Sequence, residues 1–151
     1  KKGQLIGLLT GKHSELDALF PEYAECAQKI PFNIYDIREI LSEKARAILT
    51  REGTKARDFL DVYFICRRFS IRLDDVERCT VNKTNFALNF YSKYRSNLKE
   101  KISLLDSGKL FEWGEERALL LSEIDEGDFY LFLSELQEFL EKIVSNLKYR
   151  L

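Results

Sequence analysis

Methionine is absent from this sequence, and histidine (His13 alone), proline (two) and cysteine (three) are scarce. The three cysteines are widely spaced, and no Cys or His spacing matches a zinc ligand set, which argues against a zinc site or a disulfide framework. Three reduced thiols are typical of an intracellular protein, so a cytoplasmic location is expected. Because the chain lacks even an initiator methionine, we expect it to be a piece of a longer protein.

Long hydrophobic runs and an excess of charge of either sign are absent too. No apolar run approaches the roughly 20 residues that cross a bilayer, so no membrane partner is expected. The 24 basic and 25 acidic residues give a net charge of −1, which does not favour a general binder of nucleic acids or membrane surfaces. With 151 residues, of which 45% are hydrophobic, the chain can bury one ordinary core.

Helical periodicity dominates the sequence after its second proline. The spacing predicts helices over residues 36–51, 54–69, 73–79, 82–105, 112–124 and 128–149, with Thr54 as the N-cap of the second, and a short strand over 4–9. The expected fold class is therefore mostly α, a helical bundle with room for a short N-terminal strand. We expect residues 36–151 to form the helical domain and residues 1–35 to be a linker or the edge of another core.

Lys44 is out of place in the first of these helices. At about 100° per residue it lies about 20° from Ile37 and about 40° from Ile48, close to the centre of the apolar stripe. A buried ammonium without a partner costs several kcal/mol or loses its proton. We therefore expect a carboxylate or an anionic ligand beside Lys44, unless its side chain reaches the surface.

Asp58 and Asp61 are the candidate partners. They lie about 60° apart on the next helix, which is nearly apolar all round and is expected to be buried on most sides. An ion pair of Lys44 with either carboxylate, locking the two helices together, is a purely structural explanation. A functional site is the other, because buried charge clusters occur in both settings.

The stretch IREILSEKARAILTREGTKARDFLDVYFI resembles the helical part of the AbiEii/AbiGii toxin-family nucleotidyltransferases. The residues that carry the resemblance are Glu39, Glu43, Lys44 and Ala47 on the first helix, Arg51 in the turn, and Arg57, Asp58, Asp61 and Tyr63 on the second. The resemblance implies a fold similar to nucleotidyltransferases of the DNA polymerase β type, of which this chain would be the C-terminal helical part.

The resemblance also implies roles for these residues. As catalytic residues, Lys44 would contact a phosphate of the NTP and Asp58 would assist the acceptor or the lysine. The supporting and substrate-binding residues would be Glu43, Arg51, Arg57 and Asp61. In the family, a Gly-Ser motif and a pair of aspartates on a strand bind the nucleotide and Mg²⁺. Neither motif occurs here, so we expect the metal ligands outside this chain and the chain alone to be inactive.

The implied function is that of the C-terminal region of a nucleotidyltransferase toxin from a toxin–antitoxin or phage-defence system. It would transfer nucleotides from NTP to an acceptor, RNA such as tRNA, with an antitoxin protein as a possible partner. Four basic residues are candidate RNA contacts or simply a solvated helix face: Lys83, Lys93, Arg95 and Lys99. The alternative is a non-enzymatic helical module that binds an antitoxin or oligomerises through an exposed apolar patch.

Overall fold

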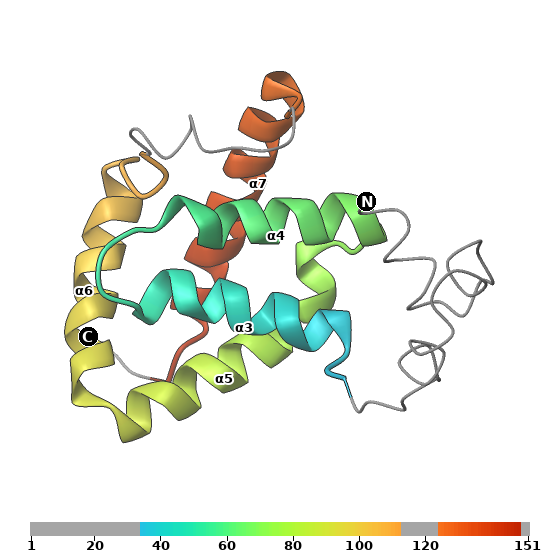
Figure 1. Ribbon diagram of the computed structural model, residues 1–151. Helices are drawn as coiled ribbons and strands as arrows, with labels where there is room; N and C mark the ends of the chain where they lie inside the picture. The colour runs from blue at the N-terminus through green and yellow to red at the C-terminus, as the bar shows by residue number, and fades with distance from the viewer. Residues whose placement is uncertain (1–33, 113–123, 149–151) are drawn as a thin grey trace, which may run out of the picture. The chain divides into compact units, whose positions relative to one another are not determined.

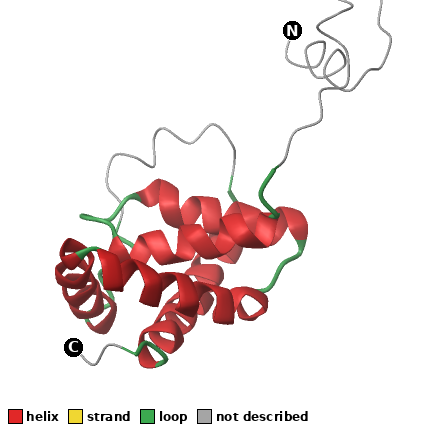
Figure 2. Ribbon diagram, turned by 90° about the horizontal axis from the view of Figure 1, so that it is seen from below, coloured by secondary structure: helices red, strands yellow, loops and turns green. Residues whose placement is uncertain are grey.

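The computed structural model describes residues 34–112 and 124–148, which form only helices and connecting segments (Figures 1 and 2). The helices are α3 (Ile37–Thr50), α4 (Ala56–Phe69), the 3₁₀ helix η2 (Leu73–Val76), α5 (Glu77–Phe90), α6 (Ser92–Asp106) and α7 (Glu126–Ser145). The mostly α fold class is thus confirmed. The expected strand over 4–9 and nearly all of the expected helix over 112–124 lie outside the described residues. The chain divides between Ile34 and Tyr35 into two units, and all of these helices belong to the second.

Helix α3 lies at the centre of the bundle and contacts α4, α5 and α6 (Figure 1). It begins where the sequence predicts, because the Asp36 carboxylate accepts a hydrogen bond of 2.8 Å from the backbone N–H of Arg38. It ends at Arg51, whose backbone is extended, and Gly53 follows with a positive φ of 65°. This short turn brings α4 back antiparallel to α3, so that the two motif-bearing helices lie side by side (Figure 1).

Helix α7 closes the core with the apolar face that its sequence predicts. Its buried residues are Phe129, Phe132, Leu133, Leu136, Phe139, Leu140 and Ile143. The ring of Tyr63 on α4 packs edge-on against Phe129 and Phe132, with centroids 5.1 and 5.3 Å away. Each fully buried side chain of this size contributes about 1.5–3 kcal/mol to folding. Packing of α7 is therefore a main source of stability for α4. Helix α4 itself is not buried on most sides as expected, since only seven of its 14 residues are buried and Phe64 and Phe69 are 38% and 50% exposed.

The prediction of one continuous helix over 82–105 is wrong. The backbone is extended at Tyr91, with φ −124° and ψ 102°, so that α5 ends and α6 begins there. A helix end leaves carbonyl groups without partners, and here Arg95 Nε donates to the carbonyl of Leu88 at 2.8 Å. The periodicity missed the break because every residue in the stretch is compatible with a helix.

The break turns α6 back across the end of α3. Asn97 Nδ2 donates to the carbonyl of Thr50 at 2.8 Å, and Lys101 Nζ donates to Thr54 Oγ1 at 2.9 Å. Thr54 therefore does not cap α4 as predicted; Lys55 takes the N-cap position without a side-chain hydrogen bond. Lys101 is only 1% exposed, and a buried cation needs hydrogen-bond acceptors, which explains its hydrogen bond to the Thr54 hydroxyl.

None of the helices in the described part of the chain is long and apolar enough to cross a membrane.

Candidate functional site

Lys44 joins α3 to α4. Its Nζ donates to Asp61 Oδ2 at 2.6 Å, and the two side chains are 30% and 43% exposed. Of the two partners that the sequence left open for Lys44, the structure selects Asp61. A pair this exposed contributes only about 0–1 kcal/mol to stability. The ion pair therefore adds little to stability, and the Lys44 side chain stays partly exposed to solvent.

The expectation that Lys44 faces the centre of the buried side of its helix is wrong. The buried face of α3 is centred on Ala45, which is fully buried together with Leu41 and Leu49. At about 100° per residue, Lys44 lies roughly 100° from Ala45, at the edge of that face. Ile40, part of the apolar stripe, is 37% exposed. The apolar stripe of α3 is wider than the surface that packs against the neighbouring helices. The spacing of apolar residues in the sequence does not show which part of the stripe is in contact.

Asp58 forms an ion pair with a different cation, Arg51. Arg51 Nη1 donates to both of its carboxylate oxygens, at 3.0 and 3.2 Å, and the Asp58 side chain is only 4% exposed. The Arg51 side chain is 40% exposed and comes from the turn after α3. Burial lowers the pKa of Lys101, and the negative charges of Glu100 and Asp58 partly offset that effect. Arg51, Asp58 and Lys101 thus form one charged group beneath the α3–α4 turn.

Glu43 belongs to a network that ties α3 to α5 and α6. Arg46 donates to the Glu43 carboxylate, and its guanidinium carbon lies 5.6 Å from the centre of the Tyr94 ring. Lys83 Nζ lies 2.5 Å from Glu39 Oε1 and 3.8 Å from Glu43 Oε2. The hydrogen bond from Lys83 is the main cause that lowers the pKa of Glu39. Glu43 is therefore a bridge between cations rather than a free carboxylate.

Two adjoining pockets open beside this network. One, of about 400 Å³, is walled by Lys44, Tyr35 and Ile40. The other, of about 540 Å³, is walled by aromatic rings of α5 and α6. Glu43 and Lys83 line both pockets, which are therefore neighbours.

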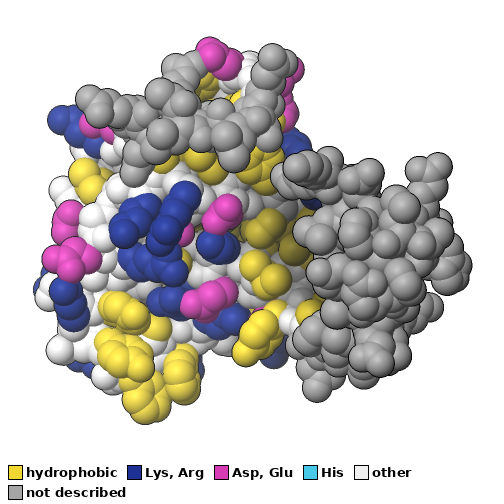
Figure 3. All heavy atoms as spheres, in the orientation of Figure 1, with side chains coloured by type: hydrophobic (Ala, Val, Ile, Leu, Met, Phe, Trp, Pro, Cys, Tyr) yellow, Lys and Arg dark blue, Asp and Glu magenta, His cyan; other side chains and the backbone are white. Residues whose placement is uncertain are grey.

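Unpaired cations flank the same surface. Lys55 and Arg57 are exposed, and within residues 34–112 and 124–148 neither side chain has a hydrogen-bond or ion-pair partner. Arg57 stands one helical turn before Asp61, so the two share a face of α4. We call Arg51, Lys55 and Arg57 the basic cluster. Figure 3 shows Lys and Arg side chains gathered over the end of α3 and the start of α4.

The comparisons with known proteins identify the family. The family model described as "Nucleotidyl transferase AbiEii toxin, Type IV TA system" matches residues 12–147, most of the chain. The chain belongs to the AbiEii nucleotidyl transferase toxin family. The resemblance carried by the two motif-bearing helices is thereby confirmed, and a toxin–antitoxin context comes with it. No curated protein and no solved structure matches the chain.

Because the chain belongs to the AbiEii family, we asked which side chains could bind a metal ion. In the parts of the chain that the structure describes, no group of three His, Cys, Asp or Glu side chains is placed to hold a metal ion. Asp58 and Asp61 are each bound to a cation instead. Asp58 and Asp61, each held by a cation, therefore do not fit a Mg²⁺ site.

The basic residues expected to contact RNA in this AbiEii-family chain are largely engaged. Lys83 binds Glu39, Lys93 Nζ lies 2.6 Å from Glu52 Oε2, and Arg95 binds a carbonyl. Of the four, Lys99 alone is exposed with no such contact in the described residues. Besides Lys99, the exposed cations with no partner in the described residues include Lys55 and Arg57 of the basic cluster. The signal of the basic cluster in the sequence was three basic residues within seven positions, around the motif turn.

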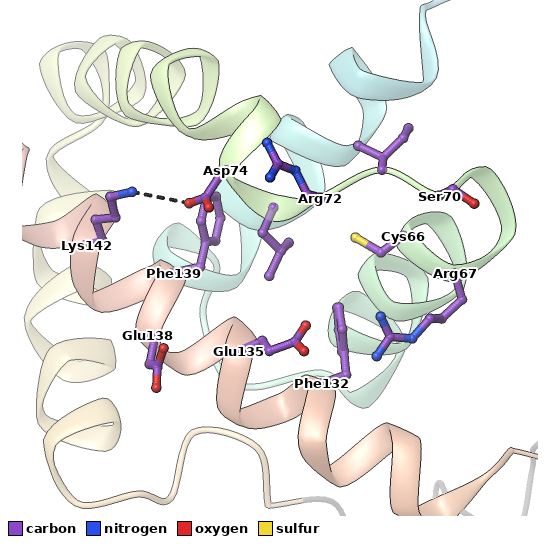
Figure 4. Close-up of a pocket in the computed structure, with 12 residues that line it drawn as sticks. Cys66, Arg67, Ser70, Arg72, Asp74, Phe132, Glu135, Glu138, Phe139 and Lys142 are labelled. Atoms are coloured by element: carbon purple, nitrogen blue, oxygen red, sulfur yellow. Dashed lines mark hydrogen bonds and ion pairs between the residues drawn. The ribbon is translucent and has the colours of Figure 1, made fainter.

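A larger cavity, of about 730 Å³, lies away from these residues, between the end of α4, η2 and α7 (Figure 4). Two cations on its wall are paired: Arg67 makes two hydrogen bonds to Asp128, of 2.8 and 2.7 Å, and Lys142 Nζ lies 3.2 Å from Asp74 Oδ1. Burial raises the pKa of Cys66, also on the wall, to about 11. None of the residues predicted for the AbiEii site lines this cavity, whose ion pairs hold α7 against α4 and η2.

Proposed function

We propose that this chain takes part in transferring a nucleotide from an NTP to an RNA acceptor such as tRNA, and that Lys44 contacts a phosphate of the NTP. The observation that carries the proposal is the place of Lys44, held by Asp61 and half-exposed on the wall of a pocket. An ion pair of this exposure adds little stability. A lysine positioned from a packed helix is well suited to bind a phosphate.

The contacts support different roles for the two aspartates. Asp61 positions Lys44. Asp58 positions Arg51, because its carboxylate is almost fully buried and its oxygens accept from Arg51 rather than from Lys44. We propose this role in place of the one that the family resemblance implies for Asp58, which is to assist the acceptor or the lysine. Arg57 adds a further cation on the same face of α4. Nucleotidyl transfer depends on cations that offset the charge developing on phosphate oxygens.

The rest of the active site would come from a Gly-Ser motif and paired aspartates, which this sequence lacks. In this proposal the helices are the C-terminal region of a larger nucleotidyltransferase. Mg²⁺ held by that other part would neutralise and orient the phosphates. The helices described here would supply Lys44 and the basic cluster to the substrate.

The test is transfer from labelled NTP to tRNA by the intact protein. Lys44→Ala should reduce transfer by about 10²- to 10³-fold, as expected for a cation lost from the transition state. The matched control is Lys142→Ala, which removes another half-exposed, ion-paired lysine, on α7, and should leave transfer unchanged. Wild-type transfer by the Lys44 variant, with its fold intact, would rule out the phosphate contact.

The alternative, a non-enzymatic interaction module, has one observation in its favour. Tyr130 and Leu131 on α7 are 52% and 68% exposed, as a docking face would be. Capture of an antitoxin that depends on these two side chains, with no nucleotide transferred under any condition, would favour this alternative.

A further inference from the structure

Four aromatic rings gather where α5 ends and α6 begins. We call this group the aromatic cluster: Phe86, Phe90, Tyr91 and Tyr94. The rings of Phe86 and Phe90 pair with centroids 4.6 Å apart, and those of Tyr91 and Tyr94 with centroids 5.1 Å apart. Three of the four are exposed to solvent, at 63% for Phe86, 67% for Phe90 and 57% for Tyr91. Single exposed rings are ordinary, but a contiguous group of them marks an interaction surface.

The aromatic cluster adjoins the pocket of Lys44. Phe86, Tyr91 and Tyr94 line the 540 Å³ pocket, which shares Glu43 and Lys83 with the pocket beside the lysine. A ligand that reaches Lys44 along this surface therefore passes over the rings.

Positive charge borders the same rings. The guanidinium of Arg46, which also binds Glu43, lies against Tyr94, and Lys83, paired with Glu39, is on the pocket wall. Asn82, an exposed amide without a side-chain partner in the described residues, also lines this pocket. Figure 3 shows hydrophobic side chains at the lower left, directly beside the Lys and Arg side chains over α3 and α4. Aromatic faces next to cations and hydrogen-bonding groups form a surface that binds bases and phosphates together.

We propose that the aromatic cluster stacks the unpaired bases of a single-stranded end of the RNA acceptor and guides that end toward Lys44. The inference rests on the proposed function, since it supplies the acceptor for the same site. Stacking requires unpaired bases, which favours a single strand over a duplex. The rings extend along the surface in two pairs, which suits several successive bases rather than one. The Lys and Arg side chains over the end of α3 and the start of α4, beside these rings in Figure 3, favour RNA over a partner protein, because they can pair with its phosphates.

The break at Tyr91 gives the aromatic cluster its exposure. In a continuous helix, Phe86 and Phe90 would share a face with Tyr94. The extended residue instead turns α6 toward α3, where Tyr94 is partly buried, and leaves Phe86 and Phe90 outward. The apolar side chains of Phe86 and Phe90 therefore remain exposed to water, where a polar residue would not reduce the stability of the fold.

The experiment measures the binding of a fluorescent RNA of about 12 nucleotides, the length that such surfaces cover, to the intact protein without NTP. Phe90→Ala and Tyr91→Ala should each weaken binding by about 5- to 100-fold, the effect of losing one stacked base. The slope of affinity against salt should stay unchanged, because no phosphate contact is lost. Tyr91→Phe keeps the ring and should bind like the wild type. The matched control is Tyr130→Ala, an equally exposed ring on α7.

Each other outcome overturns the inference. Unchanged binding in both alanine variants, an equal loss in the Tyr130 variant, or duplex RNA bound as tightly as the single strand would do so. Variants that weaken the binding of NTP but not of RNA would assign the rings to the base of the NTP. If the alanine variants lost the binding of a partner protein and kept their affinity for RNA, the rings would be assigned to the partner protein. Lys44→Ala separates the two proposals, since it should reduce transfer by about 10²- to 10³-fold and keep RNA binding.

Discussion

Replacing Asp58 by asparagine should destabilise the fold far more than replacing Asp61 by asparagine, although the two carboxylates lie one turn apart on α4. The Asp58 side chain is 4% exposed and that of Asp61 is 43% exposed. Asp58 is also a carboxylate that acts on Lys101, whose side chain is 1% exposed and donates to Thr54 Oγ1. Without Asp58, Glu100 is the remaining negative charge that offsets the effect of burial on the pKa of Lys101.

The magnitude follows from the burial of each partner. Breaking a buried ion pair by removing one member costs about 3–5 kcal/mol. Arg51 is 40% exposed and can return to water, so we expect a smaller cost for Asp58→Asn, about 2–4 kcal/mol. Asp61→Asn breaks a half-exposed pair and should cost about 0–1 kcal/mol.

Urea denaturation followed by circular dichroism gives both free energies of unfolding. A second background, Lys101→Met, tests the reasoning directly: there Asp58→Asn should cost at least about 1 kcal/mol less, because no buried charge is left behind. The Asp58→Asn protein should also gain stability as pH rises toward 10.5, the ordinary lysine value. The sign follows because the unfolded chain then binds the proton that folded Lys101 has given up.

Two results would refute this account. Equal costs for Asp58→Asn and Asp61→Asn would show that burial does not distinguish the two carboxylates. Strict additivity of Asp58→Asn with Lys101→Met would show that the carboxylate does not act on the buried ammonium.

Two further predictions concern groups outside the Lys44 site. Hydrogen bonds from Arg67 and then Tyr63 lower the pKa of Asp128 below its ordinary 3.8, so its stabilising effect is complete above the unfolded pKa and lost as pH falls through the folded one. Urea unfolding between about pH 5 and pH 3 should show this loss, and Asp128→Asn should flatten it. Burial raises the pKa of Cys66 to about 11. Iodoacetamide should therefore modify the partly exposed Cys79 well before Cys66 in the folded protein at about pH 8, as mass spectrometry of peptides can check; equal rates would contradict the burial of Cys66.

The sequence by itself determined the helices that local periodicity and capping specify. Asp36 begins α3, Gly53 follows its end, and the buried face of α7 consists of apolar residues at helical spacing. The motif residues on α3 and α4 were also readable, because residue type and spacing within one helix place them on its faces. These features depend on interactions between residues a few positions apart, so the chain carries them without its tertiary structure.

Tertiary structure alone decided which charges meet. The α3–α4 turn brings Arg51 to Asp58 and so leaves Asp61 to Lys44. The break at Tyr91 returns α6 to α3, where buried Lys101 takes the hydroxyl of Thr54. Such partners are 7 to 47 positions apart in sequence, and their choice depends on how whole helices pack rather than on any local preference. The exposure of the aromatic cluster has the same origin, since only the path of α6 decides which rings face the core and which face water.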